Sequence, residues 1–131
     1  MNKLSTFSAP TGRLLLAMMF LMSGLSKIGS YIGTQGYMEA MGVSGALLPL
    51  VIAAEVLGGL AIIVGWKTKF IAIALAGFSV LTAVLFHADF SNQAEMTNFM
   101  KNMTIAGGFL LLVAHGPGAY ALDNRVKSTQ V

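Results

Sequence analysis

The stretch LLPLVIAAEVLGGLAIIVGW, residues 47–66, holds one charged side chain, Glu55, among apolar residues and glycines. A run of about 20 apolar residues has the length that an α-helix needs to cross the hydrocarbon core of a bilayer. A carboxyl group at that depth is costly, so ionisable residues within a span usually face the interior of a helix bundle and mark a site. Residues 47–66 therefore predict a transmembrane helix with a functional residue near its middle.

The rest of the chain has the same apolar character. Of its 131 residues, 56% are hydrophobic and 10% are charged, whereas soluble domains carry about 25% charged residues. We predict an all-α integral membrane protein in which residues 1–131 form a single transmembrane domain. Helices are expected at about residues 8–28, 45–66, 68–86 and 93–114, which gives an antiparallel bundle of four transmembrane helices.

The first predicted helix contains two basic residues, Arg13 and Lys27, on either side of the uncharged residues 14–26. At about 1.5 Å per residue this uncharged core is shorter than the bilayer, so one charge reaches the surface or Lys27 lies within the bundle. Pro10 suits a first helical turn. A cleaved signal peptide is the alternative for this segment, because basic residues precede an apolar run. Three helices would then remain.

Basic residues flank the four helices unequally. One side of the membrane would carry Lys27 and Lys101, and the other Lys3, Arg13, Lys67, Lys69, Arg125 and Lys127. Cytoplasmic flanks collect Lys and Arg, so both termini are predicted to be cytoplasmic. The same topology accounts for the net charge of +3. No nucleic-acid partner is expected, because the basic residues form no patch interleaved with aromatic side chains.

Two longer loops fall on the outer side of this topology. In residues 29–44, a candidate N-cap at Thr34 and a helix stop at Gly42 enclose residues at helical spacing, Tyr37, Met38 and Met41. We predict a short interfacial helix or lid there. In residues 87–98, Asn92 and Glu95 have the spacing of a capping box, so the fourth helix is expected to begin at this point.

Antiparallel helices bring five polar residues towards the outer side of the membrane: Lys27, Glu55, His87, Lys101 and Asn102. Glu55 lies deepest, about 15 Å from the outer start of its helix, and we predict that it pairs with Lys101 or Lys27. Such a pair handles protons or ligands, or it only fixes the helix register. The charge of Glu55 also stays open, because a Lys partner favours the carboxylate and burial favours the neutral acid.

Small residues four apart predict close helix packing, as in the pairs Ala54 and Gly58, Ala61 and Gly65, Ala72 and Ala76, and Thr104 and Gly108. The chain has no cysteine, which excludes thiol–disulfide exchange and iron–sulfur clusters ligated by its own side chains. Its two histidines, His87 and His115, fall at opposite ends of the bundle, so no metal site is expected. No nucleotide-binding motif is present.

Several segments, in this order along the chain, resemble the DoxX family: Gly24-Leu25-Ser26-Lys27, Tyr37-Met38-Glu39-Ala40-Met41-Gly42, Glu55 with Gly58-Gly59, Phe86-His87, Phe99-Met100-Lys101-Asn102 and Gly116-Pro117-Gly118. The resemblance implies a four-helix protein of the bacterial inner membrane. The family is named after a subunit of thiosulfate:quinone oxidoreductase, and other members are linked to redox and oxidative-stress complexes.

The resemblance further implies an accessory or membrane subunit in quinone-linked redox or oxidative-stress processes. A quinone or a small aromatic compound would be the ligand, a redox enzyme the partner, and no cofactor would be intrinsic. The matching site positions are Lys27, Glu55, His87, Lys101 and Asn102. The alternative is a non-catalytic membrane scaffold or a small permease, which four short helices would form as a homo-oligomer.

Overall fold

The computed structural model describes the backbone of residues 3–129 and the side chains of residues 3–125. All secondary-structure elements of the described chain are helices. Its elements are α1 (Lys3–Gly29), α2 (Tyr31–Ala40), a short 3₁₀ turn η1 (Gly45–Leu47), α3 (Leu48–Val64), α4 (Thr68–Phe86), α5 (Gln93–His115) and α6 (Leu122–Thr129).

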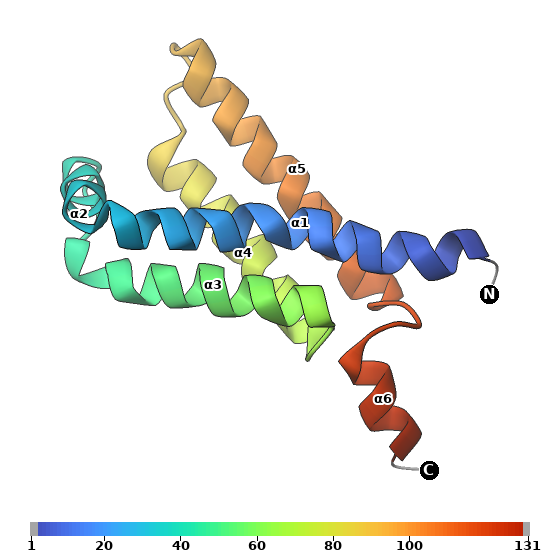
Figure 1. Ribbon diagram of the computed structural model, residues 1–131. Helices are drawn as coiled ribbons and strands as arrows, with labels where there is room; N and C mark the ends of the chain where they lie inside the picture. The colour runs from blue at the N-terminus through green and yellow to red at the C-terminus, as the bar shows by residue number, and fades with distance from the viewer. Residues whose placement is uncertain (1–2, 130–131) are drawn as a thin grey trace.

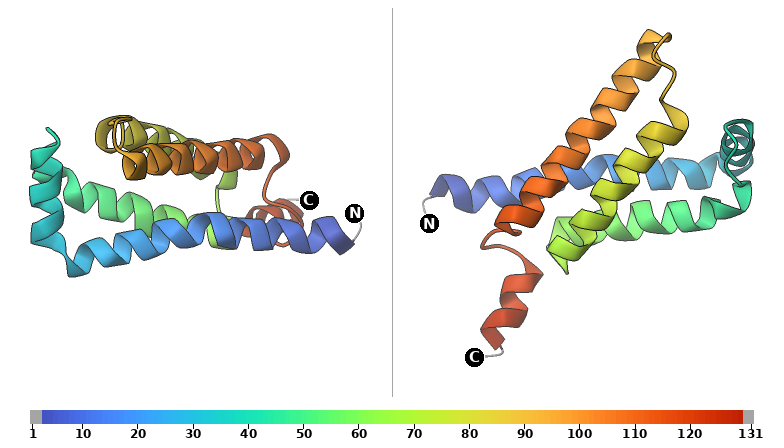
Figure 2. Two further views of the ribbon diagram at one scale, coloured as in Figure 1. Left: turned by 90° about the horizontal axis from the view of Figure 1, so that it is seen from above. Right: turned by 180° about the vertical axis from the view of Figure 1, so that it is seen from behind.

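The four long helices form two antiparallel pairs. Helix α1 packs along α3, and α4 packs along α5. The pairs make two layers that cross each other, and they diverge towards the end that carries α2 (Figures 1 and 2). We call this the α2 end. The opposite end, where the turn at Gly65 joins α3 to α4, is the Gly65 end. The predicted all-helical antiparallel architecture is confirmed.

Three of the described helical segments are long and apolar enough to cross a membrane: Lys3–Gly29, Gly45–Val64 and Thr68–Phe86. The fourth long helix, α5, has 23 residues. Its first three turns contain Gln93, Glu95, Lys101 and Asn102, which lower its mean hydropathy. These polar residues lie at the α2 end, where the site described below is found.

The start of α1 differs from the prediction. The helix begins at Lys3, so Pro10 lies inside it and not in its first turn. Contacts with the C-terminal segment support the additional turns: the rings of Phe7 and Tyr120 are 6.3 Å apart, and a Cβ atom on Gly118 would meet Ala9. These partners are more than 100 residues away in the sequence, so local patterns did not indicate the longer helix.

The loop predictions hold in part. The short helix is present as α2, but it begins after Ser30, so Thr34 lies within it and is not its N-cap. Only one residue separates α1 from α2. Asn92 caps α5, since its side-chain oxygen accepts hydrogen bonds from the backbone N–H groups of Ala94 and Glu95. The Glu95 carboxylate contacts His87, so the predicted capping box is not completed reciprocally.

Glycines let α1 and α3 approach closely. A Cβ atom on Gly59 would lie 3.2 Å from the carbonyl oxygen of Ala17 and 3.2 Å from the backbone nitrogen of Leu21. Both are backbone atoms of α1, so neither can move without shifting the helix. Predicted packing positions also meet other helices: a Cβ atom would contact Leu75 at Gly58 and Leu16 at Gly108. Small residues thus set the separation of the helices.

We expect Gly59→Ala to lower the free energy of unfolding by about 1–3 kcal/mol, because the added methyl group forces α1 and α3 apart. The matched control is Gly77→Ala in α4, where nothing lies within 4 Å of the added Cβ atom. The control should be neutral or stabilising, because alanine favours a helix by about 1 kcal/mol over glycine. Unfolding in mixed detergent micelles measures both. Equal stability of the two variants would contradict the close approach.

A cluster of polar contacts holds the Gly65 end together, and we call Arg13, Gly65, Tyr120 and Asp123 the turn clasp. The Arg13 guanidinium donates hydrogen bonds to the carbonyl oxygens of Ile62 at 3.2 Å and Ile63 at 2.9 Å, and to that of Tyr120. The carbonyl groups of Ile62 and Ile63 lie in the last turn of α3. The C-terminal end of a helix carries a partial negative charge.

The carboxylate of Asp123 completes the turn clasp from the other side. It accepts hydrogen bonds from the backbone N–H groups of Lys67 at 2.7 Å and Thr68 at 2.9 Å, which begin α4. The N–H of Asp123 donates to the carbonyl oxygen of Gly65 at 2.9 Å. Arg13 was predicted to lie among the cytoplasmic flanking charges. Arg13 does lie at the same end of the bundle as Lys67 and Lys69, but it is 2% exposed within the fold and is therefore not a solvated flanking charge.

Candidate functional site

A cavity of about 560 Å³ lies between the two helix pairs at the α2 end. Helices α1, α2, α3, α4 and α5 all contribute side chains to its lining. Helices α3 and α4, which both line the cavity, separate as they leave the Gly65 turn (Figure 2). Its inner end is closed by the packed core, in which Phe20 meets Phe78 at 6.2 Å and Phe109 at 5.5 Å between ring centroids.

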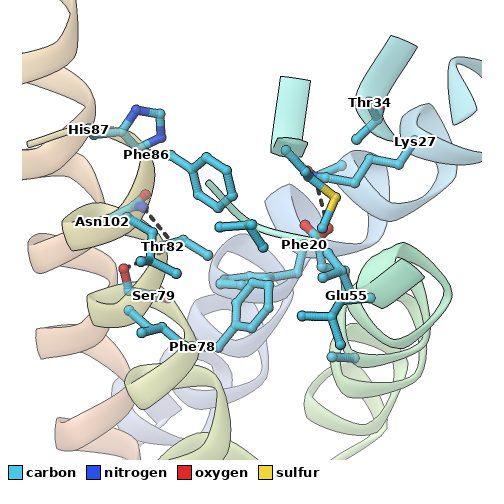
Figure 3. A pocket seen from close by; sticks show the side chains of 18 of the residues that line it. Phe20, Lys27, Thr34, Glu55, Phe78, Ser79, Thr82, Phe86, His87 and Asn102 are labelled. Carbon is cyan, nitrogen blue, oxygen red and sulfur yellow. Dashed lines mark hydrogen bonds and ion pairs between the residues drawn. The ribbon is translucent and has the colours of Figure 1, made fainter. Parts of the chain in front are cut away.

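Lys27 and Glu55 form an ion pair on the wall made by α1 and α3 (Figure 3). The Lys27 Nζ atom lies 2.8 Å from Oε1 of Glu55 and donates a hydrogen bond to the Ser23 hydroxyl at 2.6 Å. Gly24 brings the two helices together here, because a Cβ atom at this position would lie 3.1 Å from the Glu55 Cβ atom. The glycine one turn before Lys27 therefore permits the pair.

The pair is unequally buried. The Glu55 side chain is 5% exposed, whereas that of Lys27 is 28% exposed. Lys27 is near Oε1, but the contact lacks the alignment of a hydrogen bond, and the described residues provide this buried oxygen with no other partner. Oε1 of Glu55 therefore depends on one ammonium group at the cavity wall. A ligand acceptor can bind the Lys27 ammonium, and a ligand donor can bind the Glu55 carboxylate.

The opposite wall, made by α4 and α5, carries a chain of hydrogen bonds. The Asn102 amide donates to the Thr82 hydroxyl at 3.0 Å, and Thr82 donates to the carbonyl oxygen of Ser79 at 3.1 Å. The orientation of the amide follows from this network. Asn102 keeps a second N–H and its carbonyl oxygen for a ligand. Figure 3 shows this chain facing the ion pair across the aromatic rings.

Aromatic side chains close the cavity at the α2 end. The ring of Tyr37 on α2 stacks on that of Phe86 on α4, with centroids 5.5 Å apart and planes inclined by 23°. Burial raises the pKa of the Tyr37 phenol above its usual value, and the negative charge of Glu95 raises this pKa further. The phenol therefore remains protonated at neutral pH and is a donor beside the cavity.

His87 lies at the rim of the cavity, at the end of α4. Its Nδ1 atom is 2.8 Å from Oε2 of Glu95 in α5, and both side chains are about a quarter exposed, at 23% and 27%. The contact links the end of α4 to the first turn of α5. This contact uses Nδ1 of His87, and Nε2 lies on the side of the ring away from Glu95.

The structure brings four of the five predicted site residues to one cavity: Lys27, Glu55, His87 and Asn102. Lys27 is the partner of Glu55, one of the two that were proposed. Lys101 is not at the cavity but lines a shallower groove with Met19 and Met100. Successive residues of a helix point about 100° apart, so Lys101 and its neighbour Asn102 cannot both face the cavity.

Sequence reasoning missed the hydroxyl groups of the site, which belong to Ser23, Ser79 and Thr82. Their signal was present, since each is a polar residue within an apolar helix, but hydroxyl groups also bond to their own helix backbone. For metals, the residues that the structure describes contain no group of three or more His, Asp or Glu side chains able to hold an ion.

Comparisons with known proteins agree on one family. The sequence model of the family described as DoxX matches residues 9–88. Inner membrane protein YqjF of Escherichia coli (strain K12) is 51% identical over 123 residues, which cover 94% of this chain and 95% of that protein. Inner membrane protein YphA of the same organism is 36% identical over 120 residues, covering 86% of each chain. No solved structure matches the chain significantly.

Proposed function

Because the chain belongs to the DoxX family and is a multi-pass protein of the bacterial inner membrane, we propose that it is an accessory or membrane subunit in quinone-linked redox or oxidative-stress processes. In this proposal it binds a quinone or a small aromatic compound in the cavity at the α2 end. One observation carries the proposal: an aromatic-lined cavity has hydrogen-bonding groups on two opposite walls.

The size and lining of the cavity suit a flat ring. Small-molecule sites usually measure about 300–1,000 Å³ and combine apolar walls with a few polar groups that orient the ligand. The volume here is about 560 Å³. Phe20, Phe78 and Phe86 provide aromatic surfaces, and stacked or edge-to-face contacts between rings are favourable. A quinone has one oxygen at each side of its ring, which matches polar groups on facing walls.

The chemistry assigned to the walls follows from their hydrogen-bonding groups. The Lys27 ammonium would donate to one ligand oxygen, and the Asn102 amide would donate to the other. Electrons would come from a partner enzyme, since the chain has no cysteine. A reduced quinone takes up one proton at each oxygen, and Glu55 and His87 are the groups that would carry these protons on their respective sides.

The orientation in the membrane is part of the proposal. Lys3, Lys67 and Lys69 lie at the Gly65 end, and basic flanks favour the cytoplasmic side. Both termini would then be cytoplasmic, and the cavity would lie in the periplasmic half of the bilayer. A permease path through the single chain receives less support, because the packed core around Phe109 closes the inner end of the cavity.

Binding of a benzoquinone without a side chain to the protein in lipid nanodiscs tests the proposal. We expect wild-type protein to bind it, and we expect Ala54→Phe to weaken binding by at least about tenfold, because a filled cavity excludes the ring. Ala74→Phe is the matched control, since Ala74 is an exposed residue of α4 that is not part of the cavity lining. Glu55→Gln should weaken proton-coupled reduction while the protein remains inserted.

Two results would overturn the proposal. A wild-type protein that binds no quinone, or an Ala54→Phe variant that binds as tightly as Ala74→Phe, would exclude this ligand from the cavity. A symmetric homo-oligomer with a water-filled central path, seen without bound quinone, would instead support the permease alternative.

A further inference from the structure

The cavity is lined by exposed leucines as well as by polar groups. Helices α3 and α4 leave the Gly65 turn together and then diverge (Figure 2). Four leucines on these two sides line the cavity and are exposed at the same time: Leu47 and Leu50 from the α3 side, and Leu81 and Leu85 from α4. Leu50 is 68% exposed and Leu81 is 56% exposed. We call these four residues the leucine portal.

The leucine portal faces lipid, not water. Both α3 and α4 belong to segments long and apolar enough to span a membrane, and exposed leucines on such helices contact acyl chains. The polar groups of Glu55 and Asn102 lie behind the portal on the cavity walls. A molecule that enters here therefore passes from hydrocarbon to polar groups without crossing a charged surface.

The route from the aqueous side is more obstructed. The stack of Tyr37 on Phe86 joins α2 to α4 across the end of the cavity. On the same side, the contact between His87 and Glu95 joins α4 to α5. A ligand arriving from water would have to pass the Tyr37–Phe86 stack, whereas a ligand arriving from the bilayer would only displace leucine side chains.

We infer that the cavity is loaded sideways from the bilayer through the leucine portal, and that its ligands are ring compounds carrying an apolar chain. The ring lies between Lys27 and Asn102, and the chain leaves between Leu50 and Leu81 into the lipid. This inference rests on the proposed function for the identity of the ring. The side opening itself does not depend on that identity.

The first experiment tests the opening with lipid alone. In a Trp66→Phe background, tryptophan is placed inside the cavity by Phe78→Trp, and on the lipid-facing surface of α4 by Phe70→Trp. Phe70 is 72% exposed. The protein is reconstituted in phosphatidylcholine with brominated acyl chains, which quench tryptophan fluorescence on contact. We expect clear quenching at both positions, and we expect Leu50→Phe with Leu81→Phe to protect the cavity position several-fold.

The second experiment tests the role of the ligand's apolar chain. Association of decylubiquinone and of the same ring without a chain is followed in nanodiscs. The double variant Leu50→Phe/Leu81→Phe should slow association of both compounds, because both enter through the portal, and it should slow the decyl compound more, by about tenfold, because its chain stays in the portal. The matched control is Leu57→Phe/Ile73→Phe, which changes exposed residues of the same two helices outside the cavity lining.

The outcomes separate the two proposals. A cavity tryptophan that lipid does not quench while Phe70→Trp is quenched would overturn the side opening, and so would portal variants that leave the association of both ring compounds unchanged. A wild-type protein that binds neither compound would overturn the quinone function and the ring-with-chain ligand. The lipid experiment would then still decide whether the portal is open.

Discussion

Replacing Arg13 by methionine is expected to lower the free energy of unfolding by about 3 kcal/mol, because several charge-assisted hydrogen bonds are lost together. The guanidinium binds the carbonyl oxygens of Ile62, Ile63 and Tyr120. Methionine fills much of the same volume but donates no hydrogen bond, so these carbonyls lose their buried partner. The end of α3 also loses the positive charge that opposes its dipole.

Two variants control this measurement, which uses equilibrium unfolding in mixed detergent micelles. Leu14→Met changes the neighbouring residue, which is 45% exposed, and should alter stability by less than about 0.5 kcal/mol. Arg13→Lys should fall between wild type and Arg13→Met, because an ammonium group keeps the charge but lacks the planar fork that reaches both the end of α3 and the carbonyl oxygen of Tyr120. A loss below about 1 kcal/mol for Arg13→Met would show that the turn clasp contributes little to stability.

Replacing Lys27 by methionine is the second large change. It leaves the Glu55 carboxyl group, 5% exposed, without its counter-charge, and removing one partner of a buried pair costs about 3–5 kcal/mol. We expect about 2–3 kcal/mol here, because Lys27 is 28% exposed and solvent already screens part of the attraction. Binding of the quinone probe should be lost as well.

A double-mutant cycle separates the pair from the individual side chains. Glu55→Gln alone should cost less than Lys27→Met, and the double variant should recover part of the loss, because no unpaired charge remains. Lys101→Met is the matched control, since Lys101 lies in the shallower groove and not at the cavity. Additive effects of Lys27→Met and Glu55→Gln would mean that the contact contributes no coupling energy.

Composition and periodicity predicted the helices well, because lipid requires every backbone polar group to be satisfied within its own segment. The predicted third helix, residues 68–86, has the bounds of α4, and the fourth ends one residue early. The main error in helix bounds was at α1. Its first turns contact Tyr120 and Gly118. Contacts with such distant residues leave no periodic pattern in the sequence of the helix itself.

For the polar residues, depth was predictable from the sequence, whereas the choice of partner was not. The depth of Lys27, Glu55, His87 and Asn102 follows from helical rise, so their gathering at one end was predictable. The choice of Lys27 over Lys101 as the partner of Glu55 depended on how each helix is rotated about its axis. That rotation is set by close approaches at Gly24 and Gly59, which the sequence indicates as small residues without naming the opposing helix.

The sequence by itself determined that the helices lie in a lipid bilayer, how many long helices there are, that their directions alternate and how deep each polar group lies. These depend on hydrophobicity and on a fixed rise per residue, both of which are local properties. Only the tertiary structure decided that Arg13 joins the turn clasp, that Lys101 misses the cavity and that α3 and α4 part to form the leucine portal. Those features depend on helix rotation and crossing, which are set by contacts between side chains far apart in the sequence.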